Sequence, residues 1–319
     1  MNYIKMSPLA GISGFGGGAT AQTFAGAAGS PEGTGEYQGD RGILFNGYTD
    51  NADSNIIQYF SISSTGNASD FGDAVATSRS RGSVSDGTLG ICGGGDAIKV
   101  IDKITIGTTG NASDFGDLTV NNQCKAVGDG TYGIFACRAG TDTIDYVVMA
   151  TDGDASDWGN HTSTGNDGSG PTNDATRAVF FGGHGTGTSQ GKIDYMTMET
   201  TGNASDFGDC YDSGYAMNSG VVANSTRGVV AGGENRWGTI EYVTIQTTGN
   251  GTDFGDLDLE RGAVAGCSDK DTGRGVFSGG YKGSRYNKMD YISISSPANA
   301  SDFGDMTFSG GGVNGLSGD

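Results

Sequence analysis

One segment recurs six times in this chain, and that repetition constrains the fold more than any other feature. The segment joins a Gly/Asn turn to an Asp-aromatic pair, as in TTGNASDFGD ending at Asp117. The pairs are Asp70-Phe71, Asp114-Phe115, Asp157-Trp158, Asp206-Phe207, Asp253-Phe254 and Asp302-Phe303, spaced 43 to 49 residues apart. That period is the length of one four-stranded propeller blade. Six copies therefore predict six blades.

Each repeat has the same internal order, which predicts four strands. A Gly-rich apolar strand ends in Gly-Gly, as at 227–233, and a variable loop follows it. The next strand has the pattern of Ile240-Glu241-Tyr242, and the repeated turn leads into the last strand. A fourth strand precedes the next Gly-Gly strand, as at 261–266. We expect the aromatic of each Asp-aromatic pair to pack between neighbouring blades.

The ends of the repeat array indicate how the ring closes. The first copy lacks a clear strand before it, and the tail at 310–317 resembles that missing strand. We predict an all-β, kelch-like six-bladed β-propeller over residues 38–319, in which the C-terminal strand completes the first blade. A strand at 19–25 is the alternative. Residues 1–37 form a Gly/Ala-rich arm, interpreted as a disordered leader or as an anchor that orders on a larger assembly.

Composition agrees with many short strands and limits the partners. The chain has 61 Gly and only 4 Pro, and no stretch shows the apolar spacing of an amphipathic helix. Its 37 acidic and 18 basic residues give a net charge of −19, which disfavours nucleic acid and anionic membranes. Cations, neutral glycans and basic protein surfaces remain open as ligands. No secretory signal or transmembrane stretch is evident, so we expect synthesis in the cytoplasm without membrane insertion.

The residues that carry chemistry elsewhere form no recognisable constellation here. The five cysteines have no CxxC pair, which favours buried thiols over disulfides or zinc. His161 and His184 lack ligand spacing and are interpreted as solvated loop residues. Calcium at acidic turns such as Asp302 and Asp305 is conceivable, but their spacing matches no calcium loop. We therefore expect no catalytic residue, no metal and no cofactor.

Repeated arginines and repeated Asn-x-Ser/Thr triplets belong to the repeat itself. The arginines, at one repeat position, are Arg41, Arg177, Arg227 and Arg274, and this regularity argues against a sialidase-like arginine triad. The triplets begin at Asn67, Asn111, Asn203, Asn250 and Asn299. They match the glycosylation motif, but they are part of the repeated turn, so we interpret the match as chance.

The Gly-Gly strand end, the Tyr of the next strand and the last aromatic resemble the kelch repeat over nearly the whole chain after residue 38. The ASDFGD turn is similar to the Asp-box of sialidase-type propellers, without its full pattern. The tandem TTGNASDFGDL copies and the opening IKMSPLAGISGFGGGA resemble kelch-like repeat proteins of tailed marine and cyanobacterial bacteriophages. That resemblance implies a virion component, such as a tail-fibre protein, with a role in host attachment.

The loops that differ between repeats are where binding specificity is expected. Their candidate ligand-binding residues are Arg236, Trp237, Tyr281, Arg285 and Tyr286, which could equally cover the blade ends. The expected function is that of a virion structural protein, present in several copies. It would be held by other virion proteins through the arm and would contact a host-surface glycan or protein. The alternatives are a propeller hydrolase acting on host polysaccharide and a purely scaffolding subunit.

Overall fold

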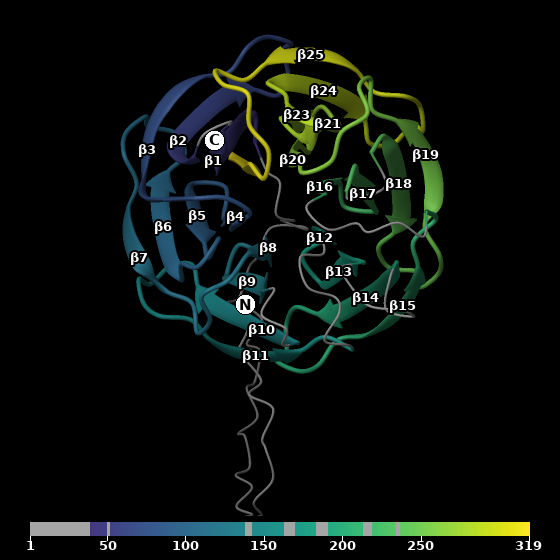
Figure 1. Ribbon diagram of the computed structural model, residues 1–319. Coiled ribbons are helices and arrows are strands. Elements are labelled where there is room, and N and C mark those ends of the chain that lie inside the picture. The colour runs from purple at the N-terminus through teal and green to yellow at the C-terminus, as the bar shows by residue number, and fades with distance from the viewer. Residues whose placement is uncertain are drawn as a thin grey trace, which may run out of the picture.

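The computed structural model describes residues 39–49, 52–137, 142–162, 170–182, 191–212, 219–233 and 237–319. Within these ranges the chain forms six four-stranded antiparallel sheets arranged as a ring (Figure 1). The chain is therefore a six-bladed β-propeller, as the repeats predict. No described residue is helical, and no helix there could cross a bilayer.

Each blade runs from an inner strand at the centre of the ring to an outer strand at its rim. From the centre outward, blade 1 contains β26 (Asn314–Gly318), β1 (Arg41–Tyr48), β2 (Asp53–Ser61) and β3 (Ser69–Ser78); blade 2 contains β4 (Gly82–Ser85), β5 (Leu89–Gly93), β6 (Val100–Thr105) and β7 (Ser113–Asp117); blade 3 contains β8 (Cys124–Gly128), β9 (Tyr132–Cys137), β10 (Thr143–Val148) and β11 (Ser156–Asn160). Blade 4 contains β12 (Gly170–Asn173), β13 (Arg177–Phe181), β14 (Lys192–Thr197) and β15 (Ser205–Asp209); blade 5 contains β16 (Gly220–Ala223), β17 (Arg227–Ala231), β18 (Thr239–Thr244) and β19 (Thr252–Asp256); blade 6 contains β20 (Ala265–Asp269), β21 (Arg274–Ser278), β24 (Lys288–Ser293) and β25 (Ser301–Asp305).

The C-terminal strand closes the ring. Strand β26 pairs antiparallel with β1, with Arg41 opposite Gly318 and Phe45 opposite Asn314. The predicted closure is confirmed, and it leaves β1 without a free inner edge. The alternative strand at 19–25 and the arm at 1–37 lie outside the described residues.

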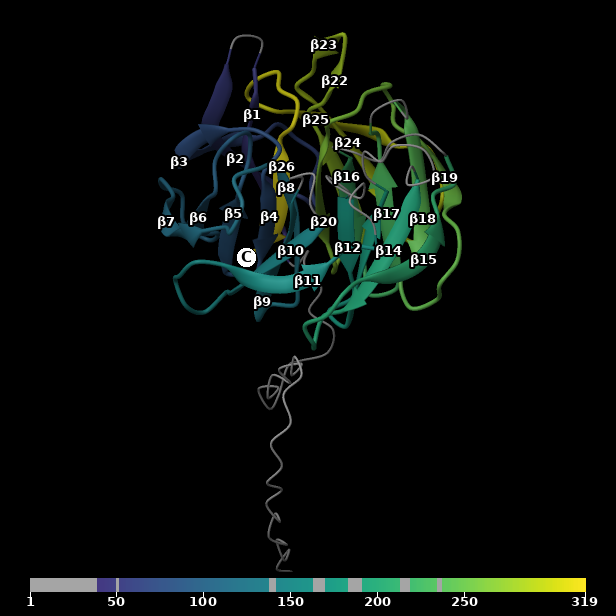
Figure 2. The same ribbon diagram turned by 60° about the horizontal axis from the view of Figure 1, so that its bottom comes forward.

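The propeller has two different faces (Figure 2). We call the first the loop face, because it carries the loops between the second and third strands of each blade and the connections between blades. The hairpin of β22 (Tyr281–Lys282) and β23 (Ser284–Arg285) rises from it. The opposite turn face carries the repeated turns and both ends of the described chain, where the Asp40 amide donates to the Asp319 carboxylate at 3.0 Å. The segment preceding residue 39 therefore joins the propeller opposite the variable loops.

The aromatic of the repeat lies between blades because the last strand contains a bulge. Across β2 and β3, Ile57 faces Gly72 and the next residue faces Asp70, so Phe71 is the extra residue. Phe71 is only 3% exposed and packs with Ile57 of its own blade and Ile104 of blade 2. A bulge at the same place occurs in all six blades. It turns each aromatic into the contact between neighbouring sheets.

The glycine and asparagine of the repeat join each outer strand to the turn of the next blade. A Cβ on Gly72 would collide with the carbonyl of Gly110, so only glycine fits. Beside it, Asn111 Oδ1 accepts a 3.0 Å hydrogen bond from the Asp73 amide. The other five blade junctions have the same hydrogen bond from a backbone amide to a side-chain oxygen. The accepting side chain and the donating amide are Asp154 and Asp117, Asn203 and Asn160, Asn250 and Asp209, Asn299 and Asp256, and Asn67 and Asp305. The Asn-x-Ser/Thr triplets are thus part of this inter-blade contact.

The repeated arginines add a second inter-blade contact at the turn face. The Arg227 guanidinium lies 4.2 Å from the centre of the Tyr242 ring in its own blade and donates to the Ile294 carbonyl of the next blade at 2.9 Å. The other three arginines make the same two contacts, with a tyrosine ring of their own blade and a backbone carbonyl of the next blade. The pairs of partners are the Tyr59 ring and Ile106 carbonyl for Arg41, the Tyr195 ring and Ile245 carbonyl for Arg177, and the Tyr291 ring and Ile62 carbonyl for Arg274. Blade 3 has Tyr132 at this position, packed edge-on against Tyr146.

Candidate functional site

Of the five candidate residues singled out in the sequence, four lie within the described residues, on the loop face of blades 5 and 6. Tyr281 and Arg285 face each other across the β22–β23 hairpin, and the Tyr286 amide donates to the Gly280 carbonyl at 3.0 Å. Trp237 lies just before β18 in the neighbouring blade. Arg236 lies outside the described residues. Three of the five candidates are therefore close together, and Trp237 belongs to an adjoining feature.

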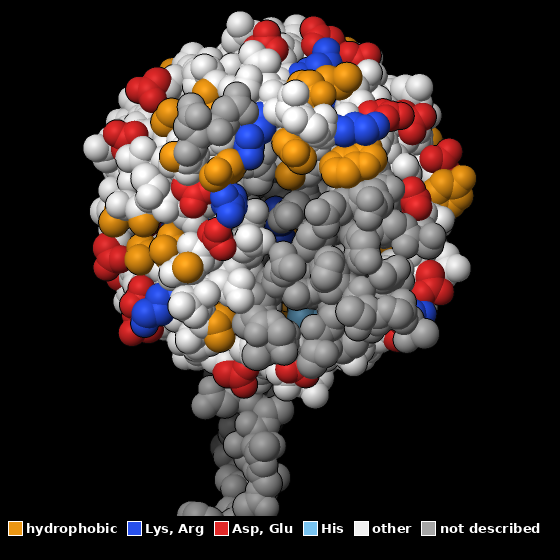
Figure 3. Space-filling view, in the orientation of Figure 1, with side chains coloured by type: hydrophobic (Ala, Val, Ile, Leu, Met, Phe, Trp, Pro, Cys, Tyr) orange, Lys and Arg blue, Asp and Glu red, His pale blue; other side chains and the backbone are white. Residues whose placement is uncertain are grey.

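The hairpin forms an arginine–tyrosine ridge with blade 1, defined by Tyr48, Arg79, Tyr281 and Arg285. The guanidinium carbons of Arg285 and Arg79 lie 4.3 and 4.4 Å from the centre of the Tyr48 ring. Arg285 also lies 5.4 Å from the Tyr281 ring centre. In Figure 3, Lys/Arg and apolar side chains lie together on this part of the loop face. The ridge combines two guanidinium groups with two tyrosine rings on the surface of a strongly acidic protein.

Backbone contacts hold the ridge in place. Tyr48 exchanges hydrogen bonds with Gly311, and Tyr281 exchanges them with Gly262 in the connection before β20. The Arg79 side chain is also fixed by Asp53 at 3.2 Å and Asp96 at 2.7 Å. Tyr281 nonetheless remains 40% exposed. The ridge is therefore a preorganised surface with accessible aromatic area.

Sequence reasoning missed two residues of this ridge, Tyr48 and Arg79. Tyr48 lies in the first repeat's variable loop, GYTDNADSN, whose variability was the available signal. Arg79 lies in a connection between blades, and nothing in its spacing indicated that it would meet Tyr48. That contact forms between blade 1 and its connection to blade 2, whereas the contact of Arg285 with Tyr48 depends on the closed ring, which places blades 6 and 1 side by side.

A cleft of about 400 Å³ opens at Trp237. Its lining residues are Asp212, Trp237, Gly238, Thr239, Asp256, Leu257 and Glu260, which we call the Trp237 cleft. They come from the end of β19, the start of β18 and the two connections that flank blade 5. Glu260 forms an ion pair with Lys282 of the β22–β23 hairpin, so the cleft and the hairpin adjoin. Its polar lining is acidic, and one wall is an indole ring.

Three carboxylates lie together where blade 6 meets the connection from blade 5, and a metal could be considered there. Oxygens of Asp258, Asp290 and Asp302 lie within 4.8 Å of one another. The Lys288 ammonium sits among them, 2.8 Å from Asp258 and 2.9 Å from Asp302. Hydrogen bonds to these two carboxylates raise the pKa of Lys288. A side-chain cation therefore occupies the position that a metal ion would need, and Asp305, the other acid considered in the sequence, is not in this group.

Two arginines are completely buried, each beside an aspartate of the third strand. Arg81 donates to Asp102 at 2.6 Å, and Arg261 donates to Asp290 at 2.7 Å. Burial raises the pKa of Asp102 and Asp290, and the neighbouring guanidinium opposes that rise. Both arginines also donate hydrogen bonds to backbone carbonyls. The two Arg–Asp pairs are therefore structural ion pairs that a ligand does not reach.

His161 is not the solvated residue that the sequence suggested. It is only 6% exposed, and its ring packs edge-on against Phe180 with 4.9 Å between ring centres. Its Nδ1 lies 3.6 Å from Asp194 Oδ2. Although burial raises the pKa of Asp194, the adjacent His161 ring and hydrogen bonds from Thr162 lower it below its usual value. The histidine thus belongs to a blade junction. His184 lies outside the described residues.

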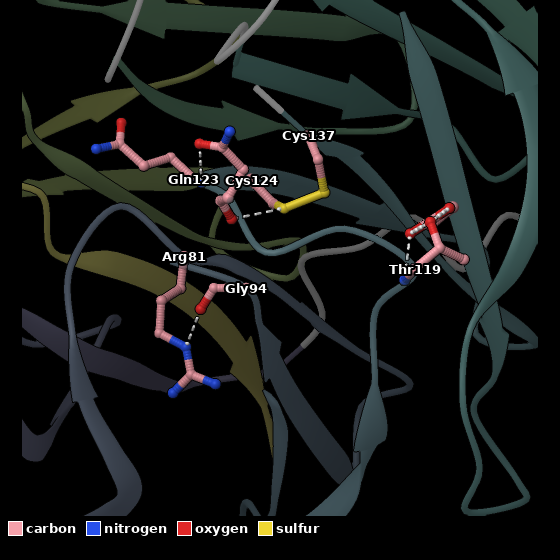
Figure 4. The surroundings of a disulfide bond; sticks show 8 residues. Arg81, Gly94, Thr119, Gln123, Cys124 and Cys137 are labelled. Atoms are coloured by element: carbon pink, nitrogen blue, oxygen red, sulfur yellow. Dashed lines mark hydrogen bonds between the residues drawn. A yellow bond between two sulfur atoms is a disulfide. The ribbon is translucent and has the colours of Figure 1, made fainter. Parts of the chain in front are cut away.

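The cysteines also require a correction, because two of them form a disulfide. Cys124 on β8 and Cys137 on β9 face each other directly and are bonded (Figure 4). Spacing alone could not reveal a bond that depends on strand register. The other three cysteines, Cys92, Cys210 and Cys267, are buried thiols. Burial raises the pKa of Cys92 to about 12, which makes it unreactive.

The centre of the ring offers little space. Gly266 would collide through a Cβ with the Val221 carbonyl, and Gly315 with the Gly266 carbonyl, so the inner strands touch. The central cavity has about 30 Å³ and includes Arg81 and Lys125 in its lining. Burial lowers the pKa of Lys125 to about 8. This cavity is far smaller than a typical ligand pocket, so the loop face is the better candidate for binding.

Ring closure, six blades and a narrow centre define the class of this protein as a six-bladed β-propeller. A scan against models of protein families gave no match, and a search of curated proteins found no relative. The ridge and the cleft are therefore the features from which a function can be inferred.

Proposed function

We propose that this protein is a binding module in which the loop face of the propeller contacts a surface glycan. The observation that carries the proposal is the arginine–tyrosine ridge, where the Tyr48 ring contacts both Arg79 and Arg285. Tyrosine and arginine are the residue types that dominate recognition surfaces, because they combine apolar area with hydrogen-bond donors. The anchored backbone and the exposed Tyr281 ring suit binding without rearrangement.

We further propose that the module is a structural component of a bacteriophage virion, displayed in several copies for host attachment or decoration. The resemblance of its repeats and of its opening segment to tailed-phage proteins supports this placement. Residue 39 joins the turn face, opposite the ridge. A protein held by its N-terminal arm on other virion proteins would present the ridge to the host.

The test compares binding of the full chain to host envelope polysaccharide with binding of two variants. Tyr48→Ala with Arg285→Ala removes the ridge contact and should weaken binding about tenfold or more. Glu199→Gln, on the turn face, is the control and should bind as the unaltered protein does. Equal binding by the ridge variant and the unaltered protein contradicts the role of the ridge, and no binding by the unaltered protein contradicts the function.

The same experiment separates the two other interpretations. A hydrolase would release new reducing ends from the polysaccharide, and the release would stop after substitution of one carboxylate. A scaffolding subunit would need residues 1–37 for incorporation into particles, while the ridge variant would leave host adsorption unchanged. The binding module is supported if the polysaccharide stays uncleaved and the ridge variant no longer adsorbs to the host.

A further inference from the structure

One of the repeat positions at which blades 5 and 6 differ lines the Trp237 cleft. Thr239 of blade 5 and Lys288 of blade 6 occupy equivalent positions. Each begins the third strand of its blade, and each faces the last residue of the outer strand, Asp256 and Asp305 respectively. In blade 6 the lysine reaches Asp258 and Asp302. In blade 5 the short threonine lines the open cleft, and its hydroxyl contacts Asp212 at 3.3 Å.

An aromatic residue stands at the same position of both blades. The Trp237 carbonyl accepts from the Arg261 amide, and the Tyr286 carbonyl accepts from the Gly310 amide at equivalent places. The backbone frame of the two loops is thus alike. Within this frame, blade 6 has the long, ion-paired side chain of Lys288 where blade 5 has the short Thr239 that lines the cleft.

We infer that the Trp237 cleft binds one or two rings of a neutral saccharide. This inference rests on the proposed function and names the ligand class and the site. A sugar ring has an apolar face that can pack on the indole of Trp237, and hydroxyl groups that can donate to Asp212, Asp256 and Glu260. Carboxylates only accept hydrogen bonds, and O–H donors to carboxylates make short, strong ones.

The size and charge of the cleft define the ligand further. Its volume of about 400 Å³ is at the small end of the range for small-molecule sites. Three carboxylates on a protein of net charge −19 repel uronic or sialic acids. Glu260 is already paired with Lys282, which favours a neutral polyol over a strongly basic peptide. The adjoining hairpin would contact the continuation of the same chain.

The fluorescence of Trp237 reports directly on whether a ligand occupies the cleft. The chain has two tryptophans, and Trp158 is only 2% exposed between blades 3 and 4. Acrylamide quenching therefore reports mainly on Trp237. The probes are neutral tetrasaccharides of glucose, galactose, mannose and N-acetylglucosamine, a uronic-acid tetrasaccharide, and an oligolysine peptide. We expect at least one neutral probe to protect Trp237, and the uronic-acid probe and peptide to leave it accessible.

The decisive variant is one that fills the cleft with a longer side chain. Thr239→Lys reproduces the residue of blade 6 and should weaken binding of the neutral probe about tenfold or more, with an unchanged melting temperature. Thr143→Lys places the same side chain at the equivalent position of blade 3 and should bind normally. Asp256→Asn tests the carboxylate and should also weaken binding, because an amide replaces a charged acceptor.

The outcomes distinguish this inference from the proposed function. Protection by no neutral probe, preferential protection by oligolysine, or equal binding by Thr239→Lys and the unaltered protein would each overturn the inference. If the unaltered protein adsorbs to host polysaccharide and Thr239→Lys adsorbs equally, the ridge carries the function without the cleft. If a neutral probe binds the cleft but the protein never adsorbs to cells, the cleft stands and the attachment role is wrong.

Discussion

The Arg81 Nη1 atom donates a 2.6 Å hydrogen bond to Oδ2 of Asp102, and both side chains are completely buried. Arg261 and Asp290 repeat this relationship in blade 6 at 2.7 Å. Blades 2 and 6 are the two neighbours of blade 1, which is the blade completed by the C-terminal strand. The two buried pairs therefore flank the closure of the ring.

Removal of one partner of this pair should strongly destabilise the propeller. Arg81→Met leaves the Asp102 carboxylate buried without its counter-charge, and we expect a loss of about 3–5 kcal/mol in the free energy of unfolding. Arg81→Met combined with Asp102→Leu should lose less than the single change, because no buried charge remains. Urea unfolding of both variants checks this, and an equal or larger loss in the double variant would contradict it.

The closing strand should be essential for a stable fold. Deletion of residues 314–319 removes β26, exposes the inner edge of β1 and removes Leu316, which is completely buried. We expect a lower melting temperature and concentration-dependent association through the exposed edge. Thermal unfolding and sedimentation measure the two effects. An unchanged melting temperature would show that closure contributes little.

The repeat itself offers a matched test of the inter-blade turn contact. Asn111→Ala removes the acceptor for the Asp73 amide and should cost about 1 kcal/mol. Asn111→Asp should be better tolerated, because blade 3 naturally uses Asp154 in the same contact with the Asp117 amide. Comparison of the two unfolding free energies decides whether the side-chain acceptor is the source of stability; equal losses would argue against it.

The disulfide predicts a definite thiol count. The denatured, unreduced protein should react with alkylating reagent at three cysteines, and the reduced protein at all five. Replacement of Cys124 and Cys137 by serine removes a short covalent loop and should cost about 2–3 kcal/mol. Mass spectrometry of the alkylated chain gives the count. Five reactive thiols without reduction would contradict the bond.

Lys125 predicts a pH dependence of stability. Burial lowers its pKa to about 8 in the folded chain from 10.5, so folding disfavours the protonated form. Its destabilising effect is full below pH 8 and disappears as the pH rises from 8 through 10.5. Lys125→Met should therefore be more stable than the unaltered protein at about pH 7, by about 1 kcal/mol or more, with a smaller difference at about pH 10. Melting temperatures at both values provide the measurement, and a difference that grows with pH would refute the assignment.

Much of the fold was predictable because it is repeated. Six copies of Asp-aromatic-Gly imply six equivalent sheets, and the tail at 310–317 matches the strand that the first blade lacks. The disulfide, the burial of His161 and the two Arg–Asp pairs were not predictable. Each depends on which residues face one another across neighbouring strands or blades, and a single sequence without strand register does not contain that information.

The candidate site divides in the same way. The variable loops indicated Trp237 and Tyr281, because these residues interrupt an otherwise regular pattern. The contacts around those residues were not indicated: Arg285 meets Tyr48 because the ring joins the last repeat to the first, and Lys282 meets Glu260 because blades 5 and 6 are adjacent. The amino-acid sequence by itself determined the blade number, the strand order and the closing strand, since periodic local patterns specify each blade. Only the tertiary structure decided which side chains meet between blades, because those contacts join residues far apart in the chain.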